Sequence, residues 1–135
     1  MTNPTVELPL PVMEDMELAA TKTAEVVAKR MGLDDMKTAE IGMALIEACI
    51  NAFEHSKTKD NIFIHYIIKE DTLVIKVGDR GVGFDSEVVA IPNIDEKINS
   101  SNKRGWGIQL MKELMDTVEF ETTADGTTVT MTKAK

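Results

Sequence analysis

The sequence lacks several features that mark particular classes of protein. Cysteine occurs once among the 135 residues, at Cys49, so no disulfide can form within the chain. Cys49 lies in an apolar run, which favours a buried small side chain over a reactive thiol. Aromatic residues make up only 4% of the chain, so aliphatic side chains and nine methionines must fill the interior. Because 43% of the residues are hydrophobic, we expect one folded domain that spans residues 1–135.

Positive charge is also scarce. The chain has 15 Lys and Arg residues against 23 Asp and Glu residues, which gives a net charge of −8. An acidic protein repels a phosphate backbone, so we expect no nucleic acid partner. A smaller phosphate-bearing ligand would need free backbone N–H groups, a helix N-terminus, a divalent metal or a few well-placed cations.

Long hydrophobic runs are absent, and none approaches the roughly 20 residues needed to cross a bilayer. The first 13 residues carry Pro4, Pro9 and Pro11 together with an acidic residue, which is unlike a secretory signal. We therefore expect no membrane association and a cytoplasmic location.

What the sequence does contain is an ordered series of secondary-structure signals. Hydrophobic alternation between turn residues predicts strands at 5–12, 61–69, 72–78, 117–123 and 127–133. Helical periodicity predicts helices at 14–31, at about 34–54 and at 107–115. Prolines make the first strand an edge strand or an extended arm, and Gly32 is a plausible C-cap for the first helix. Hairpins need antiparallel pairing, so the pattern predicts an α+β two-layer sandwich with helices on one face of the sheet.

The second predicted helix is apolar nearly all round, except for a narrow polar stripe that contains Glu47 and Asn51. These two residues are four apart, so their side chains are neighbours on one face. A carboxylate can act as a general base, and an amide oxygen can help to coordinate Mg²⁺. Taken alone, plain exposure to solvent explains the stripe at least as well.

A glycine-rich turn follows the third predicted strand and begins with Asp79. Gly81 and Gly83 permit positive φ angles and a close approach of the backbone to a ligand. A carboxylate at a strand end can accept a hydrogen bond from an amine such as the adenine amino group. An ordinary glycine turn remains an equal alternative, because a third glycine at the offset of a dinucleotide-binding fingerprint is missing.

The third predicted helix opens with Lys103-Arg104-Gly105-Trp106-Gly107. Glycines at a helix start expose backbone N–H groups, and the helix dipole favours an anion there. The dipole disfavours cations at that end of a helix. The presence of two of them there therefore indicates a bound anion. The alternative is a basic flank that merely precedes a helix. The chain has no Walker A sequence.

In their order and context, these segments resemble the GHKL ATPase superfamily of gyrase, a heat-shock chaperone, histidine kinases and MutL. Within it, the chain is most similar to anti-sigma factor serine kinases of the RsbW type. The resembling stretches are 46–55, 77–85, 105–118 and 126–129. The resemblance implies a Bergerat-type ATP-binding fold, a two-layer α/β sandwich with a mixed, mainly antiparallel sheet.

The resemblance also implies roles at the two ends of an ATP site. Glu47 would be the general base that deprotonates a serine hydroxyl of a protein substrate, and Asn51 would hold Mg²⁺. Asp79 would bind the adenine amino group, while Gly81 and Gly83 would shape the adenine end of the pocket. Thr127 would support the adenine through a water molecule.

At the phosphate end, the resemblance implies that Gly105 and Gly107 place backbone N–H groups on the phosphates. Residues 88–104 would form a lid, and Trp106 would lie beside the phosphates. Either Lys103 or Arg104 would contact the γ-phosphate.

Three departures from the family pattern stand out. Ser56 follows His55, where the family often has glycine, and Trp106 replaces a smaller aliphatic residue. The basic residue near the γ-phosphate is displaced, so the choice between Lys103 and Arg104 stays open. A structural role at the helix end suits His55 better than a phosphate contact.

The function implied is that of an ATP-dependent serine/threonine protein kinase in a bacterial partner-switching module. Such a kinase phosphorylates an anti-sigma factor antagonist and sequesters a sigma factor or a similar regulator. A non-catalytic ATP-binding module that binds a partner protein is the main alternative, and Glu47 argues against it. An isolated histidine-kinase catalytic domain is a third. The N-terminal strand offers an edge for pairing in a homodimer.

Overall fold

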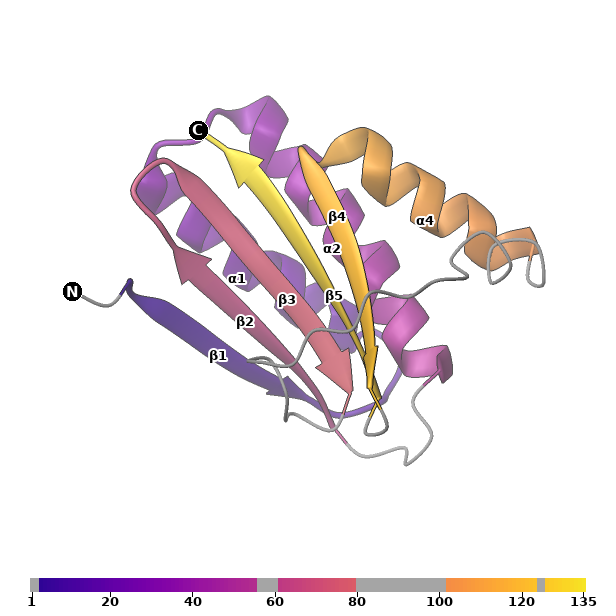
Figure 1. Cartoon of the computed structure of the whole chain (residues 1–135). Coiled ribbons are helices and arrows are strands. Elements are labelled where there is room, and N and C mark those ends of the chain that lie inside the picture. Colours follow the sequence, from indigo (N-terminus) through magenta and orange to yellow (C-terminus); the bar gives the residue numbers. More distant parts are fainter. Residues whose placement is uncertain (1–2, 56–60, 80–101, 124–125) are drawn as a thin grey trace.

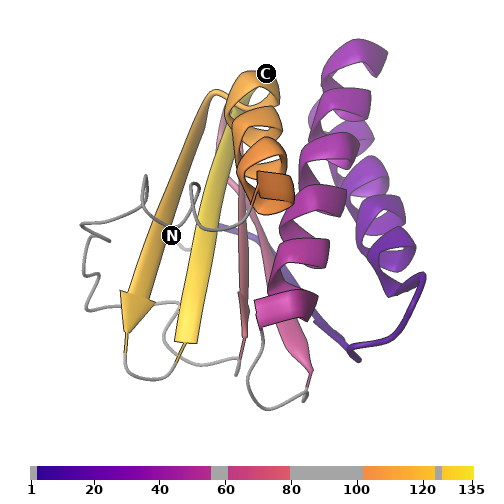
Figure 2. The same cartoon turned by 90° about the vertical axis from the view of Figure 1, so that its right-hand side faces the viewer.

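The structure is a computed structural model that describes residues 3–55, 61–79, 102–123 and 126–135. Within these ranges, the side chains of residues 55, 102–106 and 123 are not described. The described chain forms two layers, a β-sheet and a set of helices that covers one of its faces (Figures 1 and 2).

Five strands of the described chain form the sheet in the order β1-β2-β3-β5-β4, and every neighbouring pair is antiparallel. The strands are β1 (Thr5–Leu10), β2 (Ile62–Ile68), β3 (Thr72–Asp79), β4 (Thr117–Thr123) and β5 (Gly126–Ala134). The predicted α+β sandwich is therefore confirmed. The first strand also lies at an edge of the sheet, the position in which a proline such as Pro9 is tolerated.

Alternation along the strands directs one set of side chains toward the helices. In β2, Ile62, Ile64 and Tyr66 are wholly buried, and the residues between them are only partly covered. The register places Ile64 opposite Val77 of β3, which in turn lies opposite Val129 of β5. These side chains form the centre of the core, where burial contributes roughly 25 cal/mol per Å² of apolar surface.

Helix α1 (Met16–Met31) ends where the sequence predicted, at Gly32. Gly32 has a φ of 88°, in the left-handed region that favours glycine. Its N–H donates to the carbonyl of Lys29 at 3.0 Å, and the N–H of Leu33 donates to the carbonyl of Ala28 at 3.0 Å. The last turn is thereby closed by backbone hydrogen bonds, as in a glycine C-cap.

Helix α2 (Asp35–His55) lies between α1 and α4 in Figure 2. It begins after Asp34, whose Oδ1 accepts a hydrogen bond from the N–H of Lys37 at 2.8 Å, as an N-cap does. Its wholly buried side chains are Ile41, Ala44, Leu45, Ala48 and Cys49. Burial raises the pKa of the Cys49 thiol, so this cysteine is the inert core residue that the sequence predicted. None of the described helices is both long enough and apolar enough to span a membrane.

Helix α4 spans Asn102–Leu114, so the predicted start at Gly107 was wrong. Glycine has a low helix propensity, which made a start beyond Gly105 plausible from sequence. Packing overrides that preference, because α4 buries Ile108 and Met111 against the core. Residues 102–104, which were assigned to the lid, therefore belong to α4.

Candidate functional site

The polar stripe of α2 carries two side chains that have no partner among the described groups. Glu47 and Asn51 lie one helical turn apart, and each is half-buried. Neither has a hydrogen-bond or ion-pair partner among the groups that the structure describes, which exclude the side chains of residues 55, 102–106 and 123. Partly covered carboxylate and amide groups without internal partners are better suited to a ligand than to stabilising the fold, because burying them uncompensated costs free energy.

Helix α4 contacts α2 where Gly107 faces Glu47. A methyl group on Gly107 would place its carbon 2.6 Å from Oε1 of Glu47, which is closer than van der Waals contact allows. The carboxylate therefore lies directly against the backbone of α4. This neighbour of Glu47 was not predicted from the sequence, which assigned Gly107 only to phosphate binding.

The position of the glycines within α4 separates their possible roles. In a helix that begins at Asn102, the first turn leaves its N–H groups free of intrahelical bonds. That turn includes Gly105, whereas Gly107 lies further along the helix. The prediction that both glycines bind phosphate through their N–H groups stays a prediction, and Gly107 has the additional role of making room for Glu47.

A second carboxylate lies at the end of β3 and is held firmly. Oδ1 of Asp79 accepts a hydrogen bond from the backbone N–H of Thr127 at 3.0 Å. A methyl group on Gly126 would put its carbon 1.8 Å from the same oxygen, so only glycine fits there. Gly126 also has a φ of 155°, which side-chain-bearing residues rarely adopt. Asp79 and Thr127 are adjacent because β3 and β5 are neighbours in the sheet.

Gly126 was missed as a site residue. The sequence signal was present, since the Gly-Thr pair before the last strand belongs to the stretches on which the family resemblance rests. It was interpreted only as part of a hairpin turn. The contact with Asp79 depends on which strands pair, and hairpin chemistry does not specify the pairing of β3 with β5.

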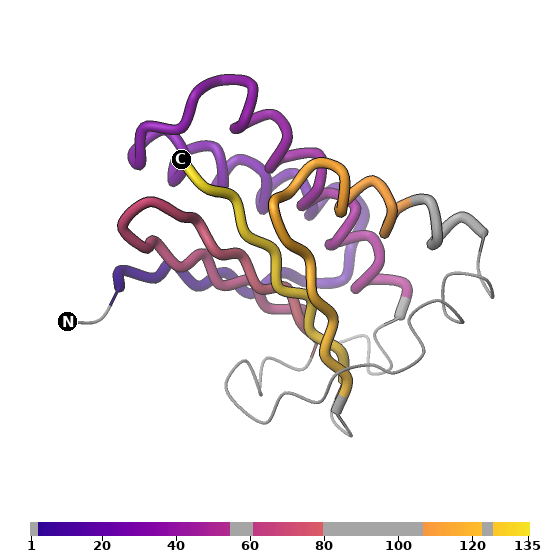
Figure 3. The backbone as a smooth tube through the Cα atoms, turned by 45° about the horizontal axis from the view of Figure 1, so that its top comes forward, coloured from indigo at the N-terminus to yellow at the C-terminus, as the bar shows by residue number. Residues whose placement is uncertain are grey.

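The two groups of residues occupy the same end of the molecule. Figures 1 and 3 show the C-terminal half of α2, the C-terminal end of β3 and the start of β5 together at this end. The helix layer contributes Glu47, Asn51 and Gly107, and the sheet contributes Asp79 and Thr127. The sequence-predicted residues that the structure describes with their side chains are thus collected at one end of the sandwich.

The donor set suits magnesium and an adenine base. Among the described residues, no group of three or more His, Cys, Asp or Glu side chains forms a metal site. Mg²⁺ commonly uses only one or two protein oxygens and takes its remaining ligands from phosphates and water. The amide oxygen of Asn51 fits that pattern, and the fixed carboxylate of Asp79 fits an exocyclic amine.

Several predicted residues cannot be placed. Gly81, Gly83 and residues 88–101 of the predicted lid lie outside the described residues, as does Ser56. For Lys103, Arg104, Gly105 and Trp106, only their membership of α4 is described, and for His55 only its membership of α2. Their assigned roles stay predictions.

His65 lies away from this site. It belongs to the set of β2 side chains that alternates with the buried ones, and it pairs with Glu7 of β1 and Lys76 of β3. Partial burial lowers the pKa of His65, an effect that Glu7 opposes and Lys76 reinforces. Its place on the sheet face opposite the helices, away from the site, fits a structural role.

Comparisons with known proteins match nearly the whole chain. A family model described as the histidine kinase-like ATPase domain matches residues 12–133. Serine-protein kinase RsbW of Bacillus pumilus (strain SAFR-032) is 31% identical over 137 residues, which cover 95% of this chain and 84% of that protein. Serine-protein kinase RsbW of Bacillus cereus (strain ATCC 10987 / NRS 248) is 32% identical over 136 residues, which cover 95% of this chain and 83% of that protein.

A solved structure shows the same fold. The crystal structure of the RsbU and RsbW domains of a Mycobacterium tuberculosis protein superimposes with a TM-score of 0.71 at 20% sequence identity. The match covers 97% of this chain and 32% of that longer chain.

Proposed function

The chain belongs to the family of histidine kinase-like ATPase domains, and on that premise we propose that it is an ATP-dependent serine/threonine protein kinase of a bacterial partner-switching module. Its similarity to proteins named serine-protein kinase RsbW extends over nearly the whole chain. The proposed substrate is a serine of an anti-sigma factor antagonist, and the proposed second partner is a sigma factor or a similar regulator. The proposed unit is a single domain of residues 1–135.

The observation that supports this proposal most strongly is the state of Glu47. Its carboxylate is half-buried, lies against Gly107 and has no partner among the described residues. Phosphoryl transfer asks little covalent chemistry of a protein and depends on positioning, a metal ion and a residue that accepts the proton of the nucleophile. An unpaired carboxylate in a partly dry site meets the last requirement.

In the proposed reaction, the serine oxygen of the substrate attacks the γ-phosphorus of ATP. The bond from that phosphorus to the bridging oxygen of ADP breaks, and Glu47 takes the proton of the serine hydroxyl. Asn51 would hold Mg²⁺, which when bound neutralises charge on the phosphates. Asp79, fixed by the N–H of Thr127, would orient the nucleotide by accepting a hydrogen bond from the adenine amino group.

The remaining site residues complete the proposal at the two ends of the nucleotide. Gly81 and Gly83 would shape the adenine end, where Thr127 would also act through a water molecule. The N–H groups of Gly105 and Gly107 would bind the phosphates, with Trp106 beside them. Residues 88–101 would cover the phosphates, and Lys103 or Arg104 in the first turn of α4 would contact the γ-phosphate.

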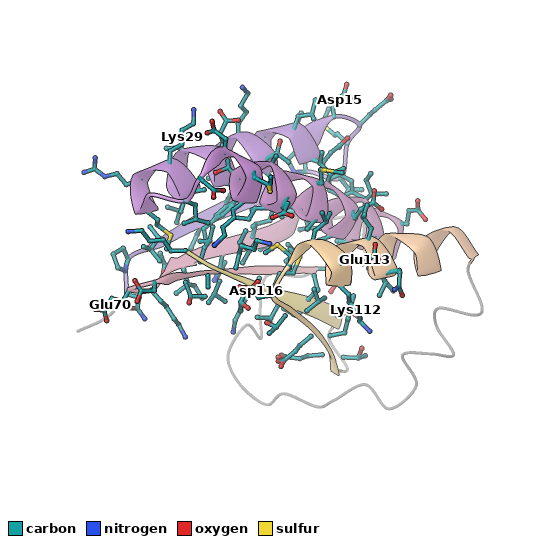
Figure 4. All side chains as sticks on the ribbon, turned by 90° about the horizontal axis from the view of Figure 1, so that it is seen from above. Asp15, Lys29, Glu70, Lys112, Glu113 and Asp116 are labelled. Atoms are coloured by element: carbon teal, nitrogen blue, oxygen red, sulfur yellow. The ribbon has the colours of Figure 1, made fainter. Side chains whose placement is uncertain are left out.

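Transfer of labelled phosphate tests the proposal. The protein is incubated with labelled ATP, Mg²⁺ and the candidate antagonist, and the experiment is repeated with Glu47→Gln and with Glu113→Gln. Glu113 is an exposed carboxylate on α4 and serves as the matched control (Figure 4). We expect Glu47→Gln to lower transfer by about 10² or more while ATP binding is retained, since loss of a general base costs 10²–10⁴-fold.

Two results would contradict the kinase proposal. One is wild-type protein that binds ATP tightly but transfers no phosphate to the antagonist, which is the behaviour of a non-catalytic partner-binding module. The other is equal transfer by the Glu47→Gln and Glu113→Gln variants, because the carboxylate would then not be the base.

Partner binding has its own structural support. Several large apolar side chains of α1 and α2 are exposed, and exposed apolar residues that gather on a surface commonly mark protein interfaces. They are Leu18, Val26, Met36 and Met43.

We further propose that a homodimer forms through β1, whose outer edge pairs with no described strand. Sedimentation of the wild type and of a Val6→Lys variant would test this, and a monomeric wild type would exclude it.

A further inference from the structure

Lys133 of β5 is the only charged residue that is buried in the part of the chain that the structure describes. Its ammonium group has two partners. It donates a hydrogen bond to the backbone carbonyl of Leu114, and it forms an ion pair with Oε1 of Glu40 at 3.0 Å. A buried ammonium without partners would be strongly destabilising, so this pairing explains why a lysine is tolerated there.

These partners belong to two different helices. Leu114 is the last residue of α4, where carbonyl groups lack intrahelical partners and the helix dipole is negative. Glu40 lies on α2. One ammonium group thus joins β5, α2 and the C-terminal end of α4.

The backbone beside Lys133 reinforces this connection. The N–H of Asp116 donates to the carbonyl of Thr132 at 2.9 Å, and Oδ2 of Asp116 accepts from the N–H of Ala134 at 2.6 Å. Three successive residues of β5, Thr132, Lys133 and Ala134, therefore bind the segment that connects α4 to β4.

The same two helices meet again at the proposed base. Glu47 follows Glu40 by seven residues on α2, and Gly107 precedes Leu114 by seven residues on α4. At a rise of 1.5 Å per residue, both intervals are about 10 Å, or two helical turns. The Lys133 bridge and the Glu47–Gly107 contact are therefore two points of one interface between antiparallel helices, which lie side by side in Figures 1 and 2.

We propose that Lys133 is a positioning residue for phosphoryl transfer. By holding the end of α4 against Glu40, it sets the position of α4 along α2, and so the place of Gly107 relative to the carboxylate of Glu47. Packed interfaces have few stable arrangements, so loss of the bridge allows α4 to shift as a unit. The inference rests on the proposed role of Glu47 as the base.

The test compares Lys133→Met with Lys112→Met. Methionine keeps most of the length of lysine, as far as the position of Cε, and removes the ammonium group. Lys112 is an exposed lysine on the last turn of α4, and its side chain extends away from α2 in Figure 4. Because a displacement of 1 Å can cost up to 10²-fold, we expect Lys133→Met to lower kcat about tenfold or more, with little change in KM for ATP. Lys133→Arg should restore much of kcat, and Lys112→Met should behave as the wild type.

Hydrogen exchange supplies a readout that does not depend on kinase activity. In Lys133→Met, amides 107–111 of α4 should exchange faster while those of α1 stay unchanged. The inference is overturned if kcat is unchanged, or if the amides of α1 and α4 accelerate by the same factor, which is general destabilisation. If Lys133→Met does not fold, Glu40→Gln takes its place, because it weakens the ion pair and leaves the bond to Leu114.

The two proposals fail in different ways. If the wild type transfers no phosphate, the proposed function fails, while the exchange of α4 amides still decides whether Lys133 positions the helix. If the wild type transfers phosphate and Lys133→Met does so equally well, only the positioning inference fails.

Discussion

Two carboxylates at the same end of this molecule each lie against a glycine, yet their surroundings differ. Asp79, in the sheet, has Gly126 beside it and accepts a hydrogen bond from the N–H of Thr127. Glu47, in the helix layer, has Gly107 beside it and has no partner in the described chain. A carboxylate fixed by a backbone donor is suited to recognition, whereas an unpaired one is suited to accepting a proton. The difference supports the proposal that Asp79 in the sheet orients the adenine and that Glu47 in the helix layer accepts the proton.

The largest expected effect comes from removing the space beside Glu47. Gly107→Ala places a methyl group against Oε1 of Glu47, and the flexible end of that side chain moves away. We expect kcat to fall about 10²-fold, as for other displaced catalytic groups, with ATP affinity nearly unchanged. Alanine also raises helix propensity, so thermal unfolding should show little loss of stability.

Gly42→Ala is the matched control for that variant. Gly42 also lies within a helix, but a methyl group there meets nothing within 4 Å. This variant should keep wild-type kcat and gain roughly 0.5–1 kcal/mol in stability from helix propensity. If Gly107→Ala behaves like Gly42→Ala, the contact with Glu47 has no bearing on catalysis.

The corresponding change beside Asp79 should act differently. Gly126→Ala pushes the carboxylate of Asp79 out of its position and imposes a backbone conformation that alanine disfavours. We expect a loss of about 2 kcal/mol in the free energy of unfolding, measured in urea. ATP affinity should fall with it, because Asp79 loses its fixed position. A variant that loses kcat alone would contradict the division between recognition and chemistry.

Asp79→Asn sharpens the same comparison by changing charge without changing shape. The amide oxygen can still accept from the N–H of Thr127, so the fold should be nearly unaffected. The second carboxylate oxygen of Asp79 is replaced by an amide NH₂ group, which can only donate and so cannot accept a hydrogen bond from the adenine amino group. ATP affinity, measured by calorimetry, should fall about tenfold, while kcat at saturating ATP should be retained. Loss of kcat with unchanged affinity would assign Asp79 to the chemistry instead.

The smallest expected effect lies outside both halves of the site, at His65. Its folded-state pKa is below the usual 6.5, so folding favours the neutral imidazole. His65 therefore contributes to the free energy of unfolding above about pH 6.5. This contribution is lost as the pH falls through the lowered pKa of His65 in the folded protein. The urea midpoint of the wild type should fall between about pH 7.5 and pH 5.5 slightly more than that of His65→Gln. Equal falls would show that His65 does not contribute.

Much of the architecture was predictable because it depends on local signals. Gly32 ends α1 through its own left-handed conformation, and the strand at 61–69 was predicted from its β-branched and aromatic residues. The start of α4 was not predictable, because low propensity at two glycines was outweighed by burial of side chains later in the helix. The residues of the site were predicted from the order of motifs in the family, not from their separate chemistry.

The sequence by itself determined the order of strands and helices, the polar pair on α2 and the membership of an ATPase family, since each depends on residues close together in the chain or on motif order. Only the tertiary structure decided that β3 lies beside β5 and that α2 lies antiparallel to α4. Those long-range contacts place Asp79 against Gly126, Glu47 against Gly107, and Lys133 between Glu40 and Leu114. They result from burying apolar faces of distant segments together, and spacing along the chain does not encode them.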